Sequence, residues 1–525
     1  MDNESQTHVR LNSQWKATCK LLLGQEVGEL SEYKEWLLEG VEPMQARISK
    51  ISGKEVYAVG KYDKSAPFMS FDEQDLEKKF PPLSINEIKD IDSIITALSD
   101  RAIYTGNIYL GKSSHVEEST GIENGHYILG THTMHNSQDV AYCGQGRENK
   151  VVFGSTIIGE SAFIIKGHNN WRSTRCMQTS RAYESSDIFY SHDLRGCSQC
   201  MFCFGLKAKR YHLGNLPLAP AKYAEIKNKL ISELVGELKE KKRLRGITEF
   251  VPKEQSRTFP LVKEPSGGEQ DMTAIAEVFS KTTSIVLGKP LSGLDAFENY
   301  FSKNIKRIEK STSAVSGREL YGEQIRFSTD IINTGRAVKY FELEEIANPV
   351  FPKRSVKIEN LSLSNMPDFI EPIAYLTPEE KHHSKNIIEC SSAHMALDCF
   401  RCSRAYHSKH SCFSFWSRDA EYTVGCDSVR NSSFCMNCYN SFKLTRCFET
   451  DTSQESTGCY FCHNCENVHD SLFCFNTKNL RNAIGNVVVG KEVFSKTKDV
   501  LLAQILDELE KKKDFKWNIY NLAKA

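Results

Sequence analysis

The chain has 525 residues, 40% of them apolar, and its 67 Lys and Arg balance 67 Asp and Glu. This composition is typical of a soluble globular protein with about two to four domains. Because the formal net charge is zero, the sequence lacks the broad positive character that non-specific nucleic-acid or anionic-membrane binding usually requires. A nucleic-acid partner is therefore not favoured.

The chain contains no apolar window of the length that a membrane-spanning helix needs, about 18 residues or more. Its start, Met1-Asp2-Asn3-Glu4-Ser5, lacks the basic and apolar regions of a secretory signal. We therefore expect no membrane association and an intracellular location, in the cytoplasm or in a virion if the source is viral. In a reducing compartment, the 18 Cys are expected to be free thiols or metal ligands.

Two parts of the chain repeat the same order of residues. Leu23-Gly24 and Ser52-Gly53-Lys54-Glu55 recur as Leu287-Gly288 and Ser316-Gly317-Arg318-Glu319, and Phe202-Cys203-Phe204 recurs as Phe473-Cys474-Phe475. The offset between the copies is constant for the first two matches and slightly larger for the third, which indicates a small insertion in the second copy. The sequence therefore predicts a tandem duplication, with copies at about 1–250 and 270–525.

Each copy is predicted to contain the same elements in the same order. A helical opener (Trp15 to Leu23; Met272 to Leu287) ends at a Gly suited to a C-cap, and a mixed segment follows to about Leu98 and Ile370. An amphipathic helix closes each copy and is expected to pack rather than bind a cofactor. The predicted units are 1–113 and 271–385 (helical and mixed parts), 114–250 and 386–525 (Cys-rich β stacks with closing helices), and a linker at 251–270.

The segment between the mixed part and the closing helix carries short apolar bursts at a nearly constant interval. In the first copy they recur about once in a dozen positions, from Tyr127-Ile128-Leu129 to Met201-Phe202-Cys203. Regular strand-length bursts with polar turns are typical of a solenoid, and two bursts, about 25 residues, are close to one coil of a parallel β-helix. We therefore predict an α+β fold with β-helix-like stacks at 114–215 and 386–486. The alternative is a pair of antiparallel β-sandwiches.

The Cys-rich stacks contain several Cys-x2-Cys runs, for which three roles are open. As zinc ligands, Cys435, Cys438, Cys459 and Cys462 would form a ribbon-like site, and Cys197, Cys200 and Cys203 form a second candidate run. As packing residues, the thiols would form a buried ladder, because several recur at the interval of one predicted coil and align with Ile in the other copy. A redox or Fe–S centre is the third alternative, although no fourth cluster ligand is evident.

Histidines and basic residues supply further candidates. Six His of the first copy are the better catalytic or metal-ligating residues, because burying His without a partner is costly: His115, His126, His132, His135, His168 and His192. The alternative is that these histidines lie on surface turns of the solenoid. The matched pairs Lys207/Lys478 and Arg210/Arg481 indicate either an anion site or, as we favour, exposed charges around a turn.

The run from Cys200 to Asn215, with Tyr223 beyond it, resembles a signature of uncharacterised Cys-rich proteins of environmental phages, ultrasmall bacteria and archaea. In those proteins a Cys-x2-Cys-Phe-Gly run precedes a Lys-x-Tyr turn and a helix. The resemblance covers only a short part of each copy and is weak in the second, where Asn476-Thr477 replaces Gly205-Leu206. It implies an intracellular or virion origin and a metal-rich or thiol-rich β unit, and it implies no activity.

No phosphate-binding loop, dinucleotide fingerprint, His-Glu-x2-His, nucleophile elbow or deaminase motif occurs in the chain. The pattern favours a non-enzymatic scaffold or assembly protein with a protein partner or self-assembly, in which structural zinc is the one cofactor considered. The alternative is a metal-dependent enzyme (Zn or Fe–S) with its site in the His-rich first copy. The second copy, with 12 of the 18 Cys, is expected to be the structural half.

Overall fold

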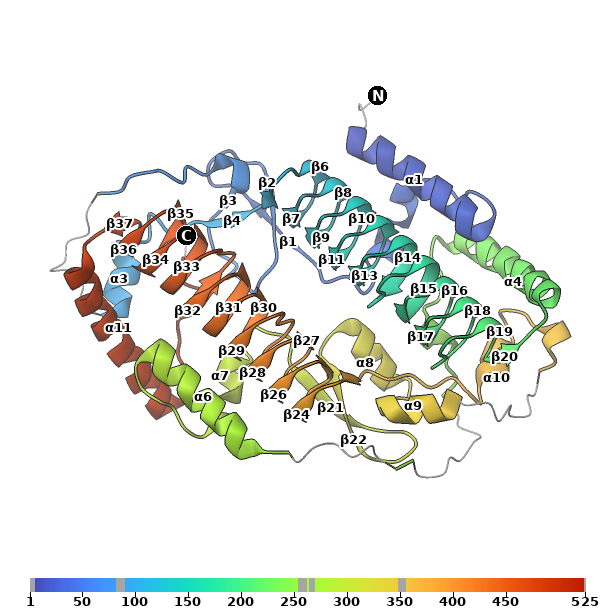
Figure 1. Ribbon diagram of the computed structural model, residues 1–525. Helices are drawn as coiled ribbons and strands as arrows, with labels where there is room; N and C mark the ends of the chain where they lie inside the picture. Colours follow the sequence, from blue (N-terminus) through green and yellow to red (C-terminus); the bar gives the residue numbers. More distant parts are fainter. Residues whose placement is uncertain (1–4, 82–89, 254–261, 264–269, 348–355, 524–525) are drawn as a thin grey trace.

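The computed structural model describes residues 5–81, 90–253, 262–263, 270–347 and 356–523. Two long stacks of short strands lie side by side at the centre of the molecule (Figure 1). Helices α1 (Gln6–Leu23) and α4 (Pro220–Lys241) cover the outer side of the first stack, and α6 (Met272–Leu287) and α11 (Lys491–Lys512) cover that of the second. The mixed α+β class predicted from the sequence is therefore confirmed.

Strands within each stack pair in parallel, which agrees with the solenoid prediction and not with antiparallel hairpins. In the first stack His126 pairs with Gln138, and Gln138 pairs with Lys150, so one coil contains twelve residues. The expected coil of about 25 residues is wrong, because each coil holds two short strands and only one of them carries an apolar burst. In the described part of the stacks, antiparallel pairing occurs only where β20 and β37 close them.

The two strands of each coil form two ladders, one beneath the covering helices and one facing the other stack. In the first stack the helix-side ladder is β6 (Ser114–Glu117), β8 (His126–Leu129), β10 (Gln138–Ala141), β12 (Lys150–Phe153), β14 (Ala162–His168), β15 (Thr174–Tyr183), β16 (Ser186–Phe189), β18 (Ser198–Met201) and β19 (Arg210–Leu213). The facing ladder is β5 (Tyr109–Leu110), β7 (Thr120–Glu123), β9 (His132–His135), β11 (Gly144–Arg147), β13 (Thr156–Gly159) and β17 (His192–Arg195), to which β14 and β15 also contribute; β20 (Leu216–Pro217) ends the stack.

The second stack has the same two ladders. Its helix side is β24 (Lys385–Ile388), β26 (Leu397–Phe400), β28 (Lys409–Cys412), β29 (Glu421–Val424), β31 (Ser433–Phe442), β32 (Thr445–Asp451), β33 (Thr457–Glu466), β34 (His469–Leu472) and β36 (Arg481–Ile484). The facing side is β23 (Glu380–His382), β25 (Ser392–His394), β27 (Ala405–Tyr406), β30 (Asp427–Arg430) and β35 (Phe475–Lys478), with parts of β31 to β33; β37 (Val487–Val488) closes it.

A backbone period of three underlies the short coil. Residues with positive φ recur at every third position, for example Tyr127, Gly130, Thr133 and Asn136, so the chain bends four times in each coil. Between successive bends one side chain points into the coil, and the interior is so narrow that a Cβ at Gly125 would lie 2.4 Å from the side chain of Ile122. Only small and medium side chains fit, which explains the Ser, Cys, Ile and Val at these positions.

Apolar side chains on the helix-side ladders form one row in each stack, with one residue from each coil. These rows pack against the covering helices and are the bursts seen in the sequence: Leu129, Ala141, Phe153, Ile165, Met177, Phe189, Met201 and Leu213 in the first stack, and Ile388, Phe400, Cys412, Val424, Met436, Phe448, Tyr460, Leu472 and Ile484 in the second. The predicted C-caps are confirmed, since Gly24 and Gly288 end their helices with φ of 78° and 88°.

The later part of each mixed segment packs on the opposite stack, whereas its first two helices pack on the stack of their own half. The first includes η1 (Leu30–Tyr33), α2 (Lys34–Leu38), β1 (Gln45–Ile48), β2 (Glu55–Ala58), β3 (Phe68–Ser70), η2 (Phe71–Glu73), α3 (Ile91–Ala97) and β4 (Tyr104–Gly106); its residues from Val56 to Tyr104 share a core with α6, α11 and the second stack. The second includes η4 (Leu294–Phe297), α7 (Glu298–Phe301), β21 (Ile308–Thr312), β22 (Glu319–Glu323), α8 (Arg326–Asn333), α9 (Tyr340–Ala347), η5 (Ile358–Asn360) and α10 (Met366–Ile370); its residues from Leu320 to Leu376 share a core with α1, α4, α5 (Ile247–Phe250) and the first stack.

Each mixed segment also forms a backbone hydrogen bond to a buried histidine of the opposite stack; we call this arrangement the exchanged packing. The backbone N–H of Thr377 donates to Nε2 of His192 at 3.0 Å, and that of Thr105 donates to Nε2 of His463 at 2.9 Å. Both histidines are fully buried. The predicted linker at 251–270 falls mostly outside the described residues, namely at 254–261 and 264–269. In the described part of the chain, no helix has the length and apolar character needed to cross a membrane.

Candidate functional site

A cavity of about 840 Å³ lies between the two stacks and is the strongest candidate site. Its walls are the facing ladders, in which each coil adds one outward side chain about 4.8 Å from the last. The outward row of the first stack is Glu123, His135, Arg147, Gly159, Trp171, Tyr183 and Arg195, and that of the second is His382, His394, Tyr406, Arg418, Arg430, Phe442, Gln454 and Glu466. We call this cavity the inter-stack cleft.

Three arginines converge near the middle of the inter-stack cleft. Arg418 and Arg430 are neighbours on adjacent coils of the second stack, and Arg147 comes from the first. Burial, followed by the charge of Arg418, lowers the pKa of Arg147. Burial and the charges of Arg418 and Arg147 also lower the pKa of Arg430, against the opposing effect of Glu123. The three guanidinium groups therefore repel one another within a partly desolvated space.

The counter-charges around these arginines are loosely held. The nearest carboxylate oxygens lie 3.3 Å from Arg147 (Glu160), 3.5 Å from Arg418 (Asp419) and 3.9 Å from Arg430 (Glu123). By contrast, Arg175 on the outer surface makes two bonds of 2.7 Å to Asp187. In addition, Nε of Arg147 is buried without a hydrogen-bond partner among the described residues. The central arginines therefore retain donor capacity for an anionic group.

Aromatic rings flank the arginines. The guanidinium of Arg147 lies 4.5 Å from the ring centroid of Trp171, two coils away. The intervening position is Gly159, where a Cβ would lie 1.9 Å from the indole, so the missing side chain makes room for this ring. Trp416, Tyr183, Tyr406 and Phe442 also line the cleft. These surfaces can contact apolar or planar groups on either side of an anion.

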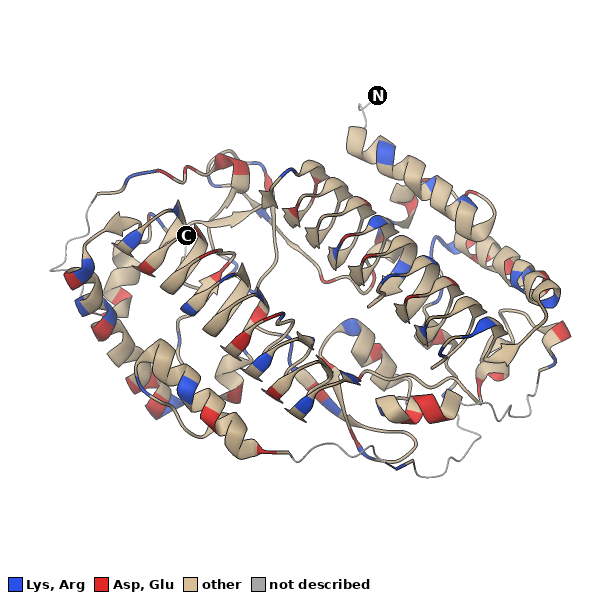
Figure 2. Ribbon diagram, in the orientation of Figure 1, with Lys and Arg blue, Asp and Glu red and all other residues tan. Residues whose placement is uncertain are grey.

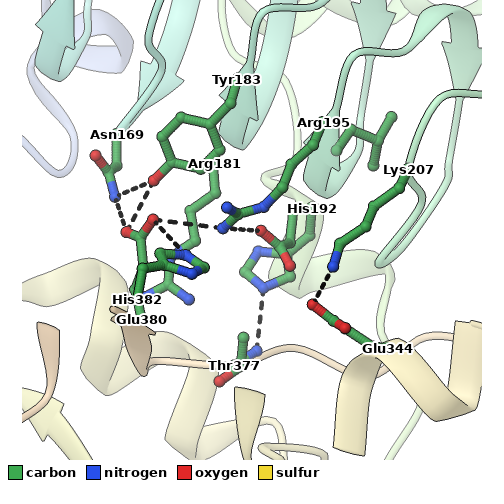
Figure 3. Close-up of polar contacts among 12 residues, drawn as sticks. Asn169, Arg181, Tyr183, His192, Arg195, Lys207, Glu344, Thr377, Glu380 and His382 are labelled. Atoms are coloured by element: carbon green, nitrogen blue, oxygen red, sulfur yellow. Dashed lines mark hydrogen bonds and ion pairs between the residues drawn. The ribbon is translucent and has the colours of Figure 1, made fainter. Parts of the chain in front are cut away.

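One end of the cleft is closed by a buried polar junction between the stacks (Figure 3). The carboxylate of Glu380 accepts hydrogen bonds from Tyr183 at 2.8 Å and Asn169 at 3.0 Å, and its other oxygen lies 3.5 Å from both Arg195 and His382. Burial opposes ionisation, but the neighbouring His382 and the charges of Arg181 and Arg195 hold the pKa of Glu380 well below its usual value. Glu380 is therefore an ionised structural anchor.

Comparisons of the chain with family models, with curated proteins and with solved structures found no match. The site must therefore be interpreted from its own geometry. Figure 2 shows Lys and Arg interspersed with Asp and Glu over both stacks, without a large region of one sign. This mixed distribution agrees with the zero net charge of the sequence.

The candidate zinc ligands lie inside the coils, where the three-residue period produces the Cys-x2-Cys spacing. Cys435 pairs with Cys447 on the next coil, and Thr450 lies between Cys438 and Cys462, so the two predicted pairs are two coils apart. That separation is about 9.5 Å, whereas thiolates on one zinc ion lie on the order of 4 Å apart. In the described residues, no three His, Cys, Asp or Glu side chains are placed to hold a metal ion.

The interior thiols take part in a hydrogen-bond ladder. Sγ of Cys143 donates to the carbonyl of Ala141 and accepts the backbone N–H of Ser155 on the next coil at 3.3 Å. Ser137 makes the same two contacts, with His135 and Asn149. Cys and Ser therefore play equivalent roles at interior positions. Cys197, Cys200 and Cys203 occupy three successive interior positions and donate in the same way to the carbonyls two residues earlier.

Protonation of the interior thiols follows from their surroundings. Burial raises the pKa of Cys143 and of Cys176 to about 12 and also raises that of Cys438. In the dense run of the second stack, hydrogen bonds from Cys459 and Cys465 lower the pKa of Cys462 against its burial. The thiolate that metals and electrophiles require is disfavoured at the first three positions. Structural zinc remains a prediction for the full chain.

The six histidines of the first copy are spread over different faces. His132, His168 and His192 lie in one column of the first stack; His132 and His192 are buried, and the half-buried ring of His168 stacks on that of Phe327 at 4.0 Å between centroids. His135 faces the inter-stack cleft and contacts Glu123 at 2.9 Å. His115 and His126 lie at the exposed end of the stack. The structure therefore does not gather these six side chains into one site.

Lys207 and Lys478 pair with carboxylates of the exchanged mixed segments. Lys207 of the first stack contacts Glu344, and Lys478 of the second contacts Glu77 at 3.4 Å. These contacts give the two lysines a docking role between the halves. The sequence did not single out the arginines and aromatic residues of the cleft. The pattern that could have identified them is their recurrence at the same position of successive coils.

A packing role for the thiols predicts a graded response to substitution. Cys447→Ser is expected to change the free energy of unfolding by less than about 1 kcal/mol, because Ser411 and Ser471 occupy the same interior column. Cys447→Ala is expected to cost about 1–2 kcal/mol, and Cys447→Leu about 1–3 kcal/mol through overpacking. Thermal melts of the full chain with and without a strong chelator should coincide. A chelator-dependent melt would instead establish structural zinc.

Proposed function

We propose that the protein is a non-catalytic binding scaffold that holds an acidic segment of a partner protein in the inter-stack cleft. The observation that carries this proposal is the convergence of Arg147, Arg418 and Arg430 from both walls, each with only loose counter-charges. A partner carboxylate would relieve their mutual repulsion and satisfy the orphaned Nε of Arg147. The cavity of about 840 Å³ suits a short peptide segment.

The mixed charge of the walls favours a peptide over a polyphosphate. Glu123, Glu160, Glu184 and Glu466 line the same cleft as the arginines. A nucleic-acid backbone places a negative charge at every nucleotide and would be repelled by these carboxylates. A peptide can present one or two acids among apolar residues, which would contact Trp171 and Trp416.

An internal duplication supports the proposal that the protein is a scaffold. We infer that the two halves are copies of one unit, because their helices, stacks and docking bonds correspond in order: Thr105–His463 in one direction matches Thr377–His192 in the other. A single offset in the sequence relates His192 to His463 and Lys207 to Lys478. A duplicated unit gives the cleft two similar walls, which can contact a bound segment from both sides. Structural zinc, if bound, would stabilise such a scaffold without changing its function.

The experiment uses the full chain and three probes of equal length: a Leu-containing peptide that carries two Glu, a Gly/Ser peptide and oligothymidylate. Binding is followed by the fluorescence of the cleft tryptophans. We expect the acidic peptide to bind most tightly and Arg418→Ala to weaken it about 10- to 100-fold, since a charge-assisted hydrogen bond contributes about 1.5–3 kcal/mol. Rising salt should weaken the wild-type complex.

Arg481→Ala is the matched control, because Arg481 lies on the helix-side ladder of the same stack and is exposed. Its affinity should equal that of the wild type. Equal binding of the acidic peptide by Arg418→Ala and wild type, or no binding of any peptide, would refute the proposal. Preferential binding of oligothymidylate would indicate that the partner is a single-stranded nucleic acid and not a protein.

A further inference from the structure

Each central arginine of the inter-stack cleft shares its nearest carboxylate with a closer basic side chain. The arginines and these carboxylates, with the distance between them, are Arg147 and Glu160 at 3.3 Å, Arg418 and Asp419 at 3.5 Å, and Arg430 and Glu123 at 3.9 Å. The closer partners are Arg172 for Glu160 at 2.8 Å, His407 for Asp419 at 3.3 Å and His135 for Glu123 at 2.9 Å. The three guanidinium groups are therefore only the second partners of these carboxylates.

Most N–H groups of the three arginines are open to solvent or to a ligand. Within the described part of the chain, the side chains of Arg418 and Arg430 make no hydrogen bond, and their closest polar contacts are the ion pairs of 3.5 and 3.9 Å. In Arg147, Nη2 donates to Glu160 at 3.3 Å, whereas the buried Nε has no partner among the described residues. Because a guanidinium carries five N–H donors in a planar fork, the cleft offers many charge-assisted donors within a small space.

The arrangement of these donors suits a group that is contacted from two sides. Arg418 and Arg430 occupy the same position on successive coils, whose backbones lie about 4.8 Å apart, and Arg147 comes from the opposite wall. The guanidinium of Arg147 lies 4.5 Å from the ring centroid of Trp171, and that of Arg430 lies 5.6 Å from the ring centroid of Phe442. A ring against the face of a guanidinium leaves its N–H edge free for an anion.

We propose that the acidic group held between these arginines is a phosphate monoester on the partner segment, namely a phosphorylated Ser, Thr or Tyr. This inference rests on the proposed function and specifies the ligand of the same cleft. A carboxylate has two oxygens and one charge, and one guanidinium can satisfy it. A phosphate monoester has three terminal oxygens and a charge of about −1.5 to −2 near pH 7, so it can accept hydrogen bonds from both walls at once. A single phosphate also lacks the repeated charge of a nucleic-acid backbone, which the carboxylates of the cleft disfavour.

The test compares versions of one Leu-containing peptide by isothermal titration into the full chain near pH 7.5. One version carries a single phosphoserine, a second carries two Glu, and a third carries unphosphorylated Ser. The first two have nearly the same charge, so their difference reports the geometry of the anionic group. We expect the phosphoserine version to bind at least about 10-fold more tightly than the two-Glu version, the effect of one further charge-assisted hydrogen bond, and the Ser version to bind most weakly. A phosphotyrosine version tests whether the carrier is aromatic, and tighter binding than the two-Glu version by either phosphopeptide supports the inference.

Conservative variants connect this preference to the arginines. Arg430→Lys keeps the charge but removes the planar fork, so it should bring the affinities for the phosphoserine and two-Glu versions together. Arg147→Lys should have the same effect from the opposite wall and provides a second variant. Arg481→Lys is the matched control, because Arg481 is exposed on the helix-side ladder, and it should leave both affinities unchanged. Thermal melts of each variant verify that the chain is folded.

The outcomes separate this inference from the proposed function. Binding of the two-Glu version as tightly as both phosphopeptides would overturn the phosphate inference and leave the acidic-segment scaffold in place. Failure of every acidic version to bind better than the Ser version would refute both. An unchanged preference in Arg430→Lys and Arg147→Lys would also overturn the inference, as would displacement of the phosphopeptide by an equal concentration of inorganic phosphate, since the ligand would then be the free anion.

Discussion

Residues 271–525 expressed alone are expected to lose cooperative folding. The second stack depends on the first mixed segment, because Val56, Tyr62, Phe68, Ile94 and Tyr104 are buried in the same core as α6 and α11. The isolated fragment would expose the apolar surfaces that these side chains cover. Full burial of one large apolar side chain contributes about 1.5–3 kcal/mol, so five of them represent roughly 10 kcal/mol. That value is comparable with the whole stability of a typical domain, about 5–15 kcal/mol.

Polar contacts between the first mixed segment and the second stack would also be lost. Tyr62 donates to the buried carboxylate of Asp451 at 2.7 Å, and Arg101 donates to the carbonyl of Gly485 at 3.0 Å. Removal of residues 1–270 would leave Asp451 and His463 with fewer partners. We expect the fragment to lack a sharp thermal transition and sharp side-chain signals in near-ultraviolet circular dichroism.

The control is a full chain with a protease site inserted in the 251–270 segment and cut after folding. Because each half holds the other's mixed segment, the two pieces should remain associated and melt in one transition close to that of the uncut chain. Co-expression of the two halves should likewise restore folding. A stable, cooperatively melting 271–525 fragment would contradict the exchanged arrangement.

Glu323→Ala is expected to destabilise the full chain by about 3–5 kcal/mol, because it leaves a buried guanidinium without its counter-charge. Oε2 of Glu323 accepts hydrogen bonds from Nη2 and Nε of Arg404 at 2.7 and 3.0 Å, and Oε1 accepts one from Ser403 at 2.6 Å. The Arg404 and Glu323 side chains are 2% and 1% exposed. The measurement is the free energy of unfolding in urea.

Two matched variants identify the cause of this loss. Glu455→Ala breaks the surface pair with Lys443, whose side chains are about half exposed, and should cost less than about 1 kcal/mol. Glu323→Leu/Arg404→Met removes both buried charges and should recover most of the stability lost by Glu323→Ala. A double variant as unstable as the single one would show that packing around β22, rather than the unpaired charge, accounts for the loss.

The length of the coil shows how far an apolar pattern can be interpreted. The bursts from Leu129 to Leu213 recur once in every coil because they form the row beneath α1 and α4. The second strand of each coil faces the cleft and carries His135, Arg147 and Trp171 instead, so it produced no burst. Counting two bursts to a coil therefore doubled its length. Hydrophobic patterning detects only the face that is buried against apolar partners.

The Cys-x2-Cys runs show a similar ambiguity. A spacing of three is the spacing of zinc knuckles, and it is also the spacing of interior positions in a coil that bends at every third residue. Cys435 and Cys438 have that spacing for the second reason in this structure, since both point into the coil and lie in one buried cluster. The sequence is compatible with both explanations, because spacing along the chain does not specify which side chains face each other.

The sequence by itself determined the local features of this protein, namely the helices that end at Gly24 and Gly288 and the short strands that recur at a regular interval, and it favoured parallel stacks and buried thiols over their alternatives. These follow from short-range periodicity and backbone preference. Tertiary structure alone decided that the mixed segments exchange stacks and that Arg147 meets Arg418 across the cleft. Such contacts join residues that lie far apart in the chain, and they depend on how whole faces pack together, which no local pattern encodes.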